Sequence, residues 1–280
     1  MRPGELVAGR FEVEIHVGSG GMGSVHRARD RESGALVALK RLRVADADAS
    51  RRFLREAELL ARLRHPGIVS YVAHGLDDAG EPYLAMAWID GEDLAHRLAR
   101  GPLDEREAQA LARSCLGALE HAHGLGMVHR DLKPGNVRIP GGDVARATLV
   151  DFGVARLLDH TALTRPGGVV GTPGYMAPEQ ARGEDVVDAR ADLFALGCVL
   201  FECVVGRPAF LARDGLALLF RLLVDDPGAP HHLRPEISPR FSALVTRLMQ
   251  KDAARRPPSA AAALGLLDDA TVAEPTDEAA

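Results

Sequence analysis

The first third of the chain alternates apolar and polar positions with a period of two, which is the spacing of half-buried β-strands. Three such segments follow one another: FEVEIHV (11–17), SVHRARD (24–30) and ALVALKRL (35–42). The next segment, SRRFLREAELLARLRH (50–65), instead repeats apolar residues at helical spacing and stops before Pro66. Further extended sequence follows, including YLAMAW (83–88). These patterns predict a small, mostly β unit that contains one helix.

The rest of the chain has the apolar spacing of helices. Asp104 followed by Glu107 is a capping-box pattern, and it predicts a helix that runs to His123. The segment DVVDARADLFALGCVLFECVVG (185–206) is apolar on nearly every side, as expected for a helix at the centre of a core. Further helices are predicted around 214–224, 238–250 and 258–268, and the acidic residues 269–280 are predicted to form a disordered tail.

These elements predict an α+β, two-lobed architecture with a small N-terminal and a larger C-terminal lobe. The predicted domain covers residues 11–268, with the N-lobe at about 11–86, a hinge at about 87–93 and the C-lobe at about 94–268. A chain of 280 residues is long enough to bury a substantial core.

Composition narrows the class of protein. The net charge is −5 and no basic block is present, so nucleic acid is a poor candidate for the main partner. The longest apolar run, FALGCVLF (194–201), is too short to span a bilayer, which needs about 18 residues. The N-terminus lacks an apolar signal segment, and Cys115, Cys198 and Cys203 form no CxxC pair. We therefore expect reduced thiols, a cytoplasmic location and no membrane contact from this segment.

Residue usage draws attention to the segment HRDLKPGN (129–136). The chain has three lysines among 34 basic residues and a single asparagine, and this segment holds both Lys133 and Asn136. A second lysine, Lys40, stands inside an apolar strand segment, where an unpaired ammonium group is unfavourable. An edge-strand lysine that reaches solvent would be a purely structural alternative. The retention of lysine in an arginine-rich chain favours a chemical role for Lys40.

The segment GSGGMGSV (18–25) matches the pattern G-x-G-x-x-G. Such glycines serve plain tight turns, or they let the backbone approach a phosphate. A dinucleotide-binding fold would need a helix directly after the last glycine. The following residues lack helical periodicity, and the turn RESG (31–34) would interrupt such a helix. The glycines are therefore predicted to join two antiparallel strands above the phosphates of a nucleotide.

Five segments together resemble the signature set of the protein kinases, in the same order: GSGGMGSV (18–25), VALK (37–40), HRDLKPGN (129–136), DFG (151–153) and APE (177–179). The resemblance extends over about residues 11–268 and is closest to the bacterial eukaryotic-like serine/threonine protein kinases. It implies a two-lobed kinase fold that uses ATP and Mg²⁺ and acts on serine or threonine hydroxyls of protein substrates.

The resemblance also implies roles for individual residues in a cleft. Lys40 would contact the α- and β-phosphates and would be held by Glu56. Asp131 would be the catalytic base, and Lys133 would contact the γ-phosphate. Asn136 and Asp151 would be the magnesium ligands, because oxygen ligands suit this ion.

The nucleotide would be enclosed by the glycine-rich segment, strand residues and the hinge. The residues assigned to it by the resemblance are Val17, Gly18, Ser19, Gly20, Gly21, Met22, Gly23, Ser24, Val25, Ala38, Lys40, Met86, Ala87, Ile89, Asp93 and Arg138. Met86 would be the gatekeeper, backbone groups of Ala87 and Ile89 would hold adenine, and Asp93 would meet the ribose. Arg138 departs from the pattern, since relatives usually have a leucine or methionine beneath the adenine ring.

Structural supports and regulation follow from the same resemblance. Leu60, Tyr71, His129 and Phe152 would stack in a column between the lobes, and Glu179 would pair with Arg256. Asp192 would cap the catalytic loop, which is the segment HRDLKPGN (129–136). Thr172 would bridge Asp131 and Lys133. Thr164, or else Thr161, would be phosphorylated and pair with Arg130, which suggests a homodimer that autophosphorylates in trans.

Two other functions remain as alternatives. A pseudokinase would bind nucleotide without transfer, although it usually lacks Lys40, Asp131 or Asp151, all of which are present. A small-molecule kinase of similar fold is disfavoured by GTPGYMAPE (171–179), which resembles a platform for protein substrates. The chain would be either a whole protein or the kinase segment of a longer, membrane-anchored one.

Overall fold

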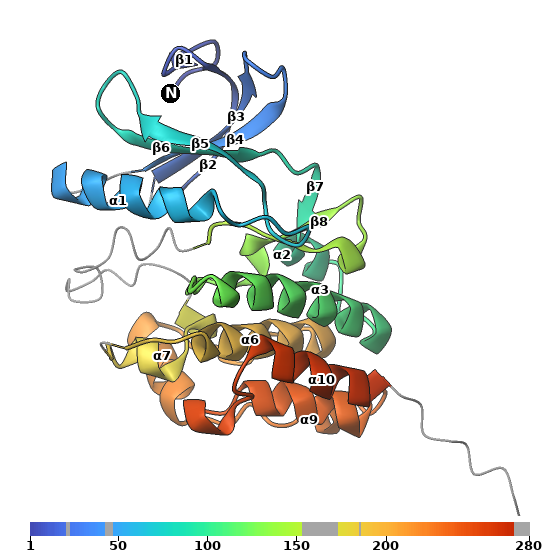
Figure 1. The fold of residues 1–280 in the computed structure, drawn as a ribbon. Helices are drawn as coiled ribbons and strands as arrows, with labels where there is room; N and C mark the ends of the chain where they lie inside the picture. The colour runs from blue at the N-terminus through green and yellow to red at the C-terminus, as the bar shows by residue number, and fades with distance from the viewer. Residues whose placement is uncertain (21–22, 43–46, 153–172, 185, 272–280) are drawn as a thin grey trace, which may run out of the picture.

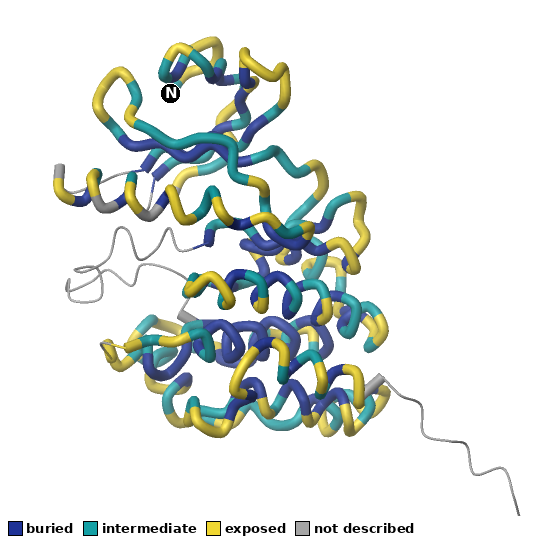
Figure 2. Tube along the Cα trace, viewed as in Figure 1, coloured by how far each residue is buried: buried dark blue, intermediate teal, exposed yellow. Residues whose placement is uncertain are grey.

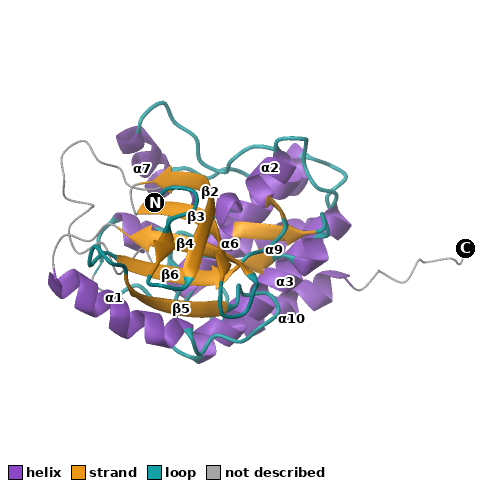
Figure 3. Ribbon diagram, turned by 90° about the horizontal axis from the view of Figure 1, so that it is seen from above, coloured by secondary structure: helices purple, strands orange, loops and turns teal. Residues whose placement is uncertain are grey.

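The computed structural model describes residues 1–20, 23–42, 47–152, 173–184 and 186–271. This part of the chain forms two lobes (Figure 1). The upper lobe in this view is a sheet with one helix packed against it, and the lower lobe is a stack of helices. Seen from above, the sheet lies over the helices of the second lobe (Figure 3). The α+β, two-lobed fold predicted from the sequence is confirmed.

The described part of the N-terminal lobe is built on a six-stranded antiparallel sheet. Its strands lie in the order β1 (Leu6–Val7), β2 (Phe11–Gly20), β3 (Gly23–Asp30), β4 (Leu36–Leu42), β6 (Pro82–Ala87) and β5 (Tyr71–Leu76). One face carries a core around Phe11 and Leu39, and the other packs against helix α1 (Ala47–Leu60) through Phe53. The period of two in the sequence therefore separates a core face from a face that looks toward α1 and the second lobe.

The C-terminal lobe consists mainly of helices. They are α2 (Leu94–Leu98), α3 (Glu105–Gly124), α5 (Pro178–Ala181), α6 (Arg190–Val205), α7 (Gly215–Val224), α8 (Pro230–Leu233), α9 (Pro239–Leu248) and α10 (Ala260–Thr271). Helix α6 packs against α3 and α9, and every residue from Ala191 to Phe201 is buried (Figure 2). A helix that is apolar on all sides can only be stable in such a position.

The capping box predicted at the start of α3 is present. The Asp104 carboxylate accepts a hydrogen bond from the Glu107 amide at 2.7 Å, and the Glu107 carboxylate accepts one from the Asp104 amide at 3.1 Å. This reciprocal pair satisfies two of the amides that have no partner within the helix. It fixes the start of the helix that carries His123 toward the catalytic loop.

A small sheet joins the lobes. Its strands are β7 (Gly91–Asp93), β8 (Val137–Pro140) and β9 (Thr148–Leu149), paired antiparallel in that order. Gly91 has φ 121°, and a Cβ there would lie 2.4 Å from the carbonyl oxygen of Ile139, so only glycine fits. This sheet holds the hinge against the strand that follows the catalytic loop.

Several boundaries differ from the predictions. Helix α1 ends at Leu60 rather than near His65, and α10 continues to Thr271, past the predicted boundary at 268. The two-residue strand β1 was not predicted. Within the residues described above, no helix is both long and apolar enough to cross a bilayer. Cys115, Cys198 and Cys203 are free thiols in the core, as predicted.

Candidate active site

The catalytic loop is held from below by Asp192 of α6. This fully buried carboxylate accepts hydrogen bonds from the amides of His129 (2.7 Å) and Arg130 (2.8 Å), and the ring of His123 lies 2.8 Å from it. Arg130 has φ 66°, a left-handed conformation that is unusual for a residue with a side chain. The hydrogen bond to its amide helps to maintain this conformation. The prediction that Asp192 caps the loop is confirmed.

The loop brings Asp131, Lys133 and Asn136 together. One carboxylate oxygen of Asp131, Oδ2, accepts hydrogen bonds from Lys133 Nζ at 2.8 Å and from Asn136 Nδ2 at 3.0 Å. Asn136 Nδ2 also donates to the Asp131 carbonyl at 2.7 Å. In the described chain no group donates to Asp131 Oδ1. Two donors thus fix the carboxylate and leave one oxygen for another ligand.

Lys40 and Asp151 form an ion pair across the lobes. Lys40 Nζ lies 2.9 Å from Asp151 Oδ2, and the lysine side chain is only 7% exposed. A buried ammonium group needs such a partner. The Glu56 side chain, the partner predicted for Lys40, lies outside the described residues, so that pairing stays a prediction. Asp151 also has a left-handed backbone, with φ 64°.

Asn136 and Asp151 lie at the same end of one strand pair. Asn136 comes directly before β8 and Asp151 follows β9, and the Val150 amide donates to the Asn136 carbonyl at 3.0 Å. The side-chain amide nitrogen of Asn136 faces Asp131, which leaves its side-chain oxygen free to act as a ligand. An amide oxygen and a carboxylate fit Mg²⁺. No cluster of three or more His, Cys, Asp or Glu side chains suited to a metal occurs among the described residues.

Aromatic packing connects this site to both lobes. The rings of His129 and Phe152 are 4.5 Å apart between centroids, and His129 Nε2 lies 2.9 Å from the Val150 carbonyl oxygen. Phe152 also lines one small cavity together with Leu60 and Tyr71. Of the predicted column, the His129–Phe152 contact is present, and Leu60 and Tyr71 line the same cavity as Phe152. The residue after Asp151 thus lies between α1, the sheet and the catalytic loop.

The sheet presents one face to the cleft. Val25 lies directly opposite Lys40 on the neighbouring strand, and Ala38 lies opposite Met86. Directly opposed residues point to the same face, so these four side chains share it. Gly23 has φ 140°, and a Cβ there would lie 1.9 Å from the Arg41 carbonyl oxygen. The third glycine of the motif therefore has a packing role in the hairpin as well as the proposed phosphate role.

The other predicted residues of the glycine-rich segment lie on the same hairpin. Val17, Gly18, Ser19 and Gly20 belong to β2, and Ser24 begins the return along β3. Ser19 and Ser24 are directly opposed, and His16 Nε2 lies 2.8 Å from the Ser19 hydroxyl. Gly21 and Met22 lie outside the described residues. The hairpin confirms the strand–turn–strand context predicted for the motif.

Two backbone amides of the hinge are hydrogen-bonded within the described protein, and a third is not. The amides of Ala87 and Trp88 donate to the carbonyls of Ser70 (2.8 Å) and Leu36 (3.1 Å). The Ile89 amide, by contrast, has no acceptor in the described part of the protein. One unused donor in this connector is what recognition of an adenine edge by the backbone requires.

Arg138 and Asp93 lie beside the hinge. The Arg138 guanidinium donates to the Ile89 carbonyl at 3.2 Å and also to the Gly91 carbonyl. Asp93 Oδ1 caps α2 through the His96 amide at 2.9 Å and lies 2.8 Å from the His96 ring nitrogen. Arg138 thus ties β8 to the hinge, and Asp93 has a structural role in addition to the predicted contact with ribose.

The lower part of the site is closed by a buried ion pair. Arg256 donates two parallel hydrogen bonds to the Glu179 carboxylate, at 2.6 and 2.8 Å, and the arginine side chain is 0% exposed. This pairing was predicted and is confirmed. The candidate regulatory threonines Thr161, Thr164 and Thr172 lie outside the described residues, so their roles stay predictions.

Some contacts in the site were not predicted. The His123 ring bonds Asp192, and the Gln180 amide donates to the Arg130 carbonyl at 3.1 Å. A histidine in the last turn of a helix and a glutamine after APE carry no distinguishing pattern in a single sequence. Their roles depend on which segments meet, so only the structure shows them.

A two-lobed fold with an ammonium group, a fixed carboxylate, an amide and a second carboxylate at the lobe junction is the arrangement of a phosphotransferase of the protein kinase type. The family comparison agrees, since the protein kinase domain matches residues 11–265. The chain belongs to this family.

Several named relatives are bacterial proteins. The chain is 38% identical to serine/threonine-protein kinase pkn3 of Myxococcus xanthus, over 92% of this chain and 49% of that protein. It is 40% identical to the DNA damage-responsive serine/threonine-protein kinase RqkA of Deinococcus radiodurans, over 94% and 40% respectively. The PknB kinase of Mycolicibacterium smegmatis is 36% identical, over 93% and 43%. The chain thus spans about half or less of the length of these relatives.

A solved structure with the same fold is Rad53 (residues 1–466) in complex with AMP-PNP. The TM-score is 0.73 at 27% sequence identity, and the match covers 91% of this chain and 64% of the other. The likeness includes both lobes and the junction between them.

Proposed function

We propose that this chain transfers the γ-phosphate of ATP to serine or threonine hydroxyls of protein substrates. The observation that carries the proposal is the convergence of Lys40, Asp131, Asn136 and Asp151, which come from separate segments of the chain. It is supported by the Lys40–Asp151 ion pair (2.9 Å) and the hydrogen bond of Asn136 to Asp131 (3.0 Å). The relatives, which are serine/threonine-protein kinases by name, support serine/threonine specificity.

The residues would divide the work as follows. A lysine ammonium has three donors, so Lys40 can keep Asp151 and still donate to the α- and β-phosphates. Asp131 would accept the proton of the substrate hydroxyl through Oδ1, while Lys133 and Asn136 hold Oδ2. The hydroxyl oxygen would then bond the γ-phosphorus as the bond from phosphorus to the bridging oxygen of ADP breaks, and Lys133 would stabilise charge on the transferred group.

Nucleotide binding would use the hinge and the cleft face of the sheet. The free amide of Ile89 would bind the adenine edge together with the Ala87 carbonyl, with Val25, Ala38 and Met86 around the ring. Asn136 and Asp151 would hold Mg²⁺, which supplies positive charge that neutralises the phosphate oxygens. The AMP-PNP complex of the similarly folded Rad53 supports an adenine nucleotide as the ligand.

The test is transfer of label from γ-³²P-ATP to a generic basic protein, followed by phosphoamino-acid analysis. Label on serine or threonine is expected, and Asp131→Asn should reduce the rate by about 10²- to 10⁴-fold, the usual size of a base contribution. Trp88, the only tryptophan, lies in the hinge, so its fluorescence can report nucleotide binding separately. Nucleotide binding without transfer would establish a pseudokinase, and ATP turnover without label on protein would indicate a small-molecule substrate.

Regulation by autophosphorylation is part of the same proposal. Thr164 or Thr161 would receive phosphate from a second copy of the chain, and Arg130 would bind it. Mass spectrometry of the wild-type chain after incubation with ATP, beside Asp131→Asn, tests this step. Phosphate at neither threonine would contradict it.

A further inference from the structure

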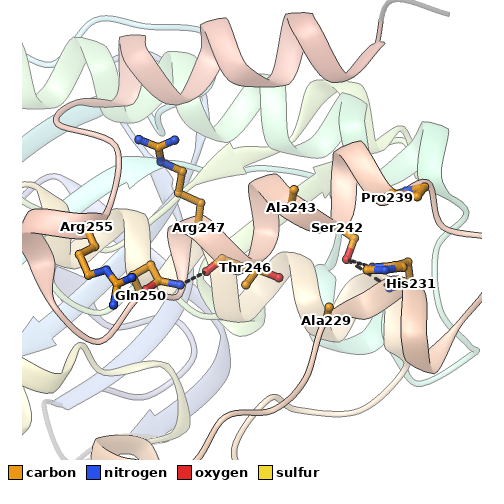
Figure 4. Close-up of a pocket in the computed structure, with 9 residues that line it drawn as sticks. All are labelled: Ala229, His231, Pro239, Ser242, Ala243, Thr246, Arg247, Gln250 and Arg255. Carbon is orange, nitrogen blue, oxygen red and sulfur yellow. Dashed lines mark hydrogen bonds between the residues drawn. The ribbon is translucent and has the colours of Figure 1, made fainter. Parts of the chain in front are cut away.

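A second concave site lies on the C-terminal lobe, on α8, α9 and the short turn after α9. Its volume is about 420 Å³. Its lining, drawn in Figure 4, consists of Ala229, His231, Pro239, Ser242, Ala243, Thr246, Arg247, Gln250 and Arg255. None of these residues belongs to the candidate active site. The site therefore has no role in the phosphoryl transfer described above.

The lining has the composition of a site for an anion. It contains two arginines and no carboxylate, although the chain as a whole carries a net charge of −5. Arg247 and Arg255 are both exposed, and neither guanidinium has a hydrogen-bond or ion-pair partner among the described residues. Other arginines of this lobe do have carboxylate partners, for example Arg234 with Glu236 and Arg190 with Asp188. Two unpaired guanidinium groups on one pocket attract an anionic ligand.

Neutral polar groups add to this character. The Thr246 hydroxyl is buried without a hydrogen-bond partner in the described chain, an arrangement that costs free energy unless a ligand or water satisfies it. Gln250 is bonded only weakly, with its amide nitrogen 3.4 Å from the Thr246 carbonyl. In Figure 4, Gln250 and Arg255 lie beside each other at one end of the pocket, next to Thr246. The basic end of the site thus offers a guanidinium group and an amide as accessible donors.

The rest of the lining fits a peptide. Pro239, Ser242, Ala243 and Thr246 recur at helical spacing along one face of α9, and their short side chains leave room for a peptide backbone. Ser242 is already engaged, because its hydroxyl accepts from the His231 amide at 3.2 Å and lies 2.8 Å from His231 Nδ1. Ser242 and His231 at the neutral end are therefore already hydrogen-bonded to each other, whereas the basic end has unused donors.

We infer that this pocket binds a phosphorylated serine or threonine within an acidic protein segment, with the phosphate at Arg255 and Gln250 and an acidic side chain of the segment at Arg247, whose guanidinium extends to the other side of α9 (Figure 4). The inference rests on the proposed function, because a protein kinase produces the phosphorylated serine or threonine that this pocket would bind. A phosphate dianion has the acceptor oxygens that a guanidinium group and an amide can share, and a carboxylate of the same segment suits the second guanidinium group. The site would hold an already phosphorylated partner while the cleft acts on another hydroxyl.

The chain itself contains a segment of suitable chemistry. Residues 270–280, ATVAEPTDEAA, place Thr276 among three acidic residues, which complements the charge of the pocket. A synthetic, fluorescently labelled peptide of this sequence with phosphothreonine at 276 is therefore the probe. Because the phosphate is introduced chemically, binding does not depend on the transferase activity, and the Asp131→Asn variant is used to prevent turnover.

Binding is measured by fluorescence anisotropy for the phosphorylated peptide, the unphosphorylated peptide and inorganic phosphate as a competitor. We expect the phosphopeptide to bind at least tenfold more tightly than the unphosphorylated form. The double variant Arg247→Gln/Arg255→Gln should weaken it at least tenfold. The control Arg62→Gln/Arg106→Gln removes the same charge from two exposed arginines elsewhere and should change affinity less than twofold.

Three outcomes would overturn the inference: equal affinity for the two peptides, equal weakening in the pocket and control variants, or displacement by inorganic phosphate at concentrations equal to those of the peptide. The last result would identify a site for the free anion. Label transfer to a generic substrate, measured in wild-type background, should be unchanged in both double variants. Loss of transfer in the wild-type chain would contradict the proposed function without affecting the binding result.

Discussion

Asp192 accepts a hydrogen bond from the amide of Arg130 at 2.8 Å, and Arg130 has a left-handed φ of 66°. A residue with a side chain adopts this conformation at a cost of about 1 kcal/mol or more. The buried carboxylate offsets that cost and, through the neighbouring His129 amide, sets the position of the loop that carries Asp131. Helix α6 thus controls the geometry of Asp131, the proposed catalytic base, from the centre of the core.

Replacing Asp192 by asparagine should disturb this loop. An amide group has one acceptor oxygen, so its nitrogen would face one of the two backbone donors. We expect the free energy of unfolding in urea to fall by about 1–3 kcal/mol, the cost of leaving a buried donor unsatisfied. The rate of transfer should fall at least tenfold with little change in nucleotide affinity. Asp188→Asn, at a half-exposed ion pair, is the control, and equal effects of the two substitutions would contradict the role of Asp192.

The ion pair of Lys40 and Asp151 should be measurable without nucleotide. Lys40→Met and Asp151→Asn each leave the other group without its partner, so each should destabilise the chain. The double variant should lose less stability than the sum of the single variants, with a coupling free energy of about 0.5–3 kcal/mol. Urea denaturation of the four proteins gives this value. Strict additivity would mean that the 2.9 Å contact does not persist in solution.

Breaking the buried pair of Arg256 and Glu179 should be costly. Arg256→Met leaves the Glu179 carboxylate buried without its partner, and such changes typically cost about 3–5 kcal/mol. Thermal or urea unfolding measures this loss. The exposed neighbour Arg255→Met is the matched control and should change the unfolding free energy by less than about 0.5 kcal/mol. A similar small effect at both positions would refute the prediction.

Arg138→Leu should tighten ATP binding. In the structure the guanidinium contacts the carbonyls of Ile89 and Gly91, and leucine would replace this polar group with apolar surface beside the adenine site. One additional buried methylene group is worth about 0.8 kcal/mol, or roughly fourfold in affinity. Titration of Trp88 fluorescence with ATP tests this, with the exposed Arg146→Leu as the control. Weaker binding would show that the contact with the hinge matters more than the apolar surface.

Lys251 should make stability depend on pH in the alkaline range. Its ammonium lies 3.8 Å from the centroid of the Phe210 ring and donates to the Leu222 carbonyl, and burial lowers its pKa to about 8. An unfolded lysine titrates near pH ~10.4. Between these values the unfolded chain binds more protons, so the unfolding free energy contributed by this group rises as the pH increases from about 8 to about 10.

Lys251→Met provides the test, because it removes the titration along with the contacts. The lost contacts shift stability by an amount that does not depend on pH, whereas the lost titration changes the slope. From about pH 8 to about pH 10, the unfolding free energy of the wild type should therefore increase relative to that of the variant. A constant difference from pH 7 to 10 would contradict the lowered pKa.

Much of the site was accessible from the sequence because its chemistry restricts the residue type. An ammonium group and an amide oxygen cannot be exchanged freely, so Lys40, Lys133 and Asn136 stood out in a chain with few lysines and one asparagine. Asp131 followed from the resemblance to a family, because carboxylates are common in the chain. The central helix was also predictable, since a segment that is apolar on all sides has only one stable place. The pairing of Glu179 with Arg256 followed from resemblance to a family rather than from any local pattern.

Other features could not be predicted, for physical reasons. Leu63 continues the apolar spacing of α1 and is buried, yet it lies beyond the end of the helix at Leu60. The spacing of apolar residues indicates which residues are buried, and a buried residue does not need to lie in a helix. The two-residue strand β1 is too short to show any period. The direction of Arg138 depends on where the hinge lies, and a long side chain takes that direction from its tertiary surroundings.

The scarcity of lysine has a consequence for chemical labelling. Lys40 is buried, Lys133 is paired with Asp131, and Lys251 lies against an aromatic ring, so none of the three amines stands free on the surface. Below about pH 7, where Lys251 with its pKa of about 8 is still mostly protonated, acylating reagents should therefore find little to modify outside the N-terminus. An ATP analogue that carries a reactive acyl group on its phosphates would deliver the reagent to Lys40 and Lys133 alone. Covalent labelling of the cleft could then be measured with almost no labelling elsewhere on the protein.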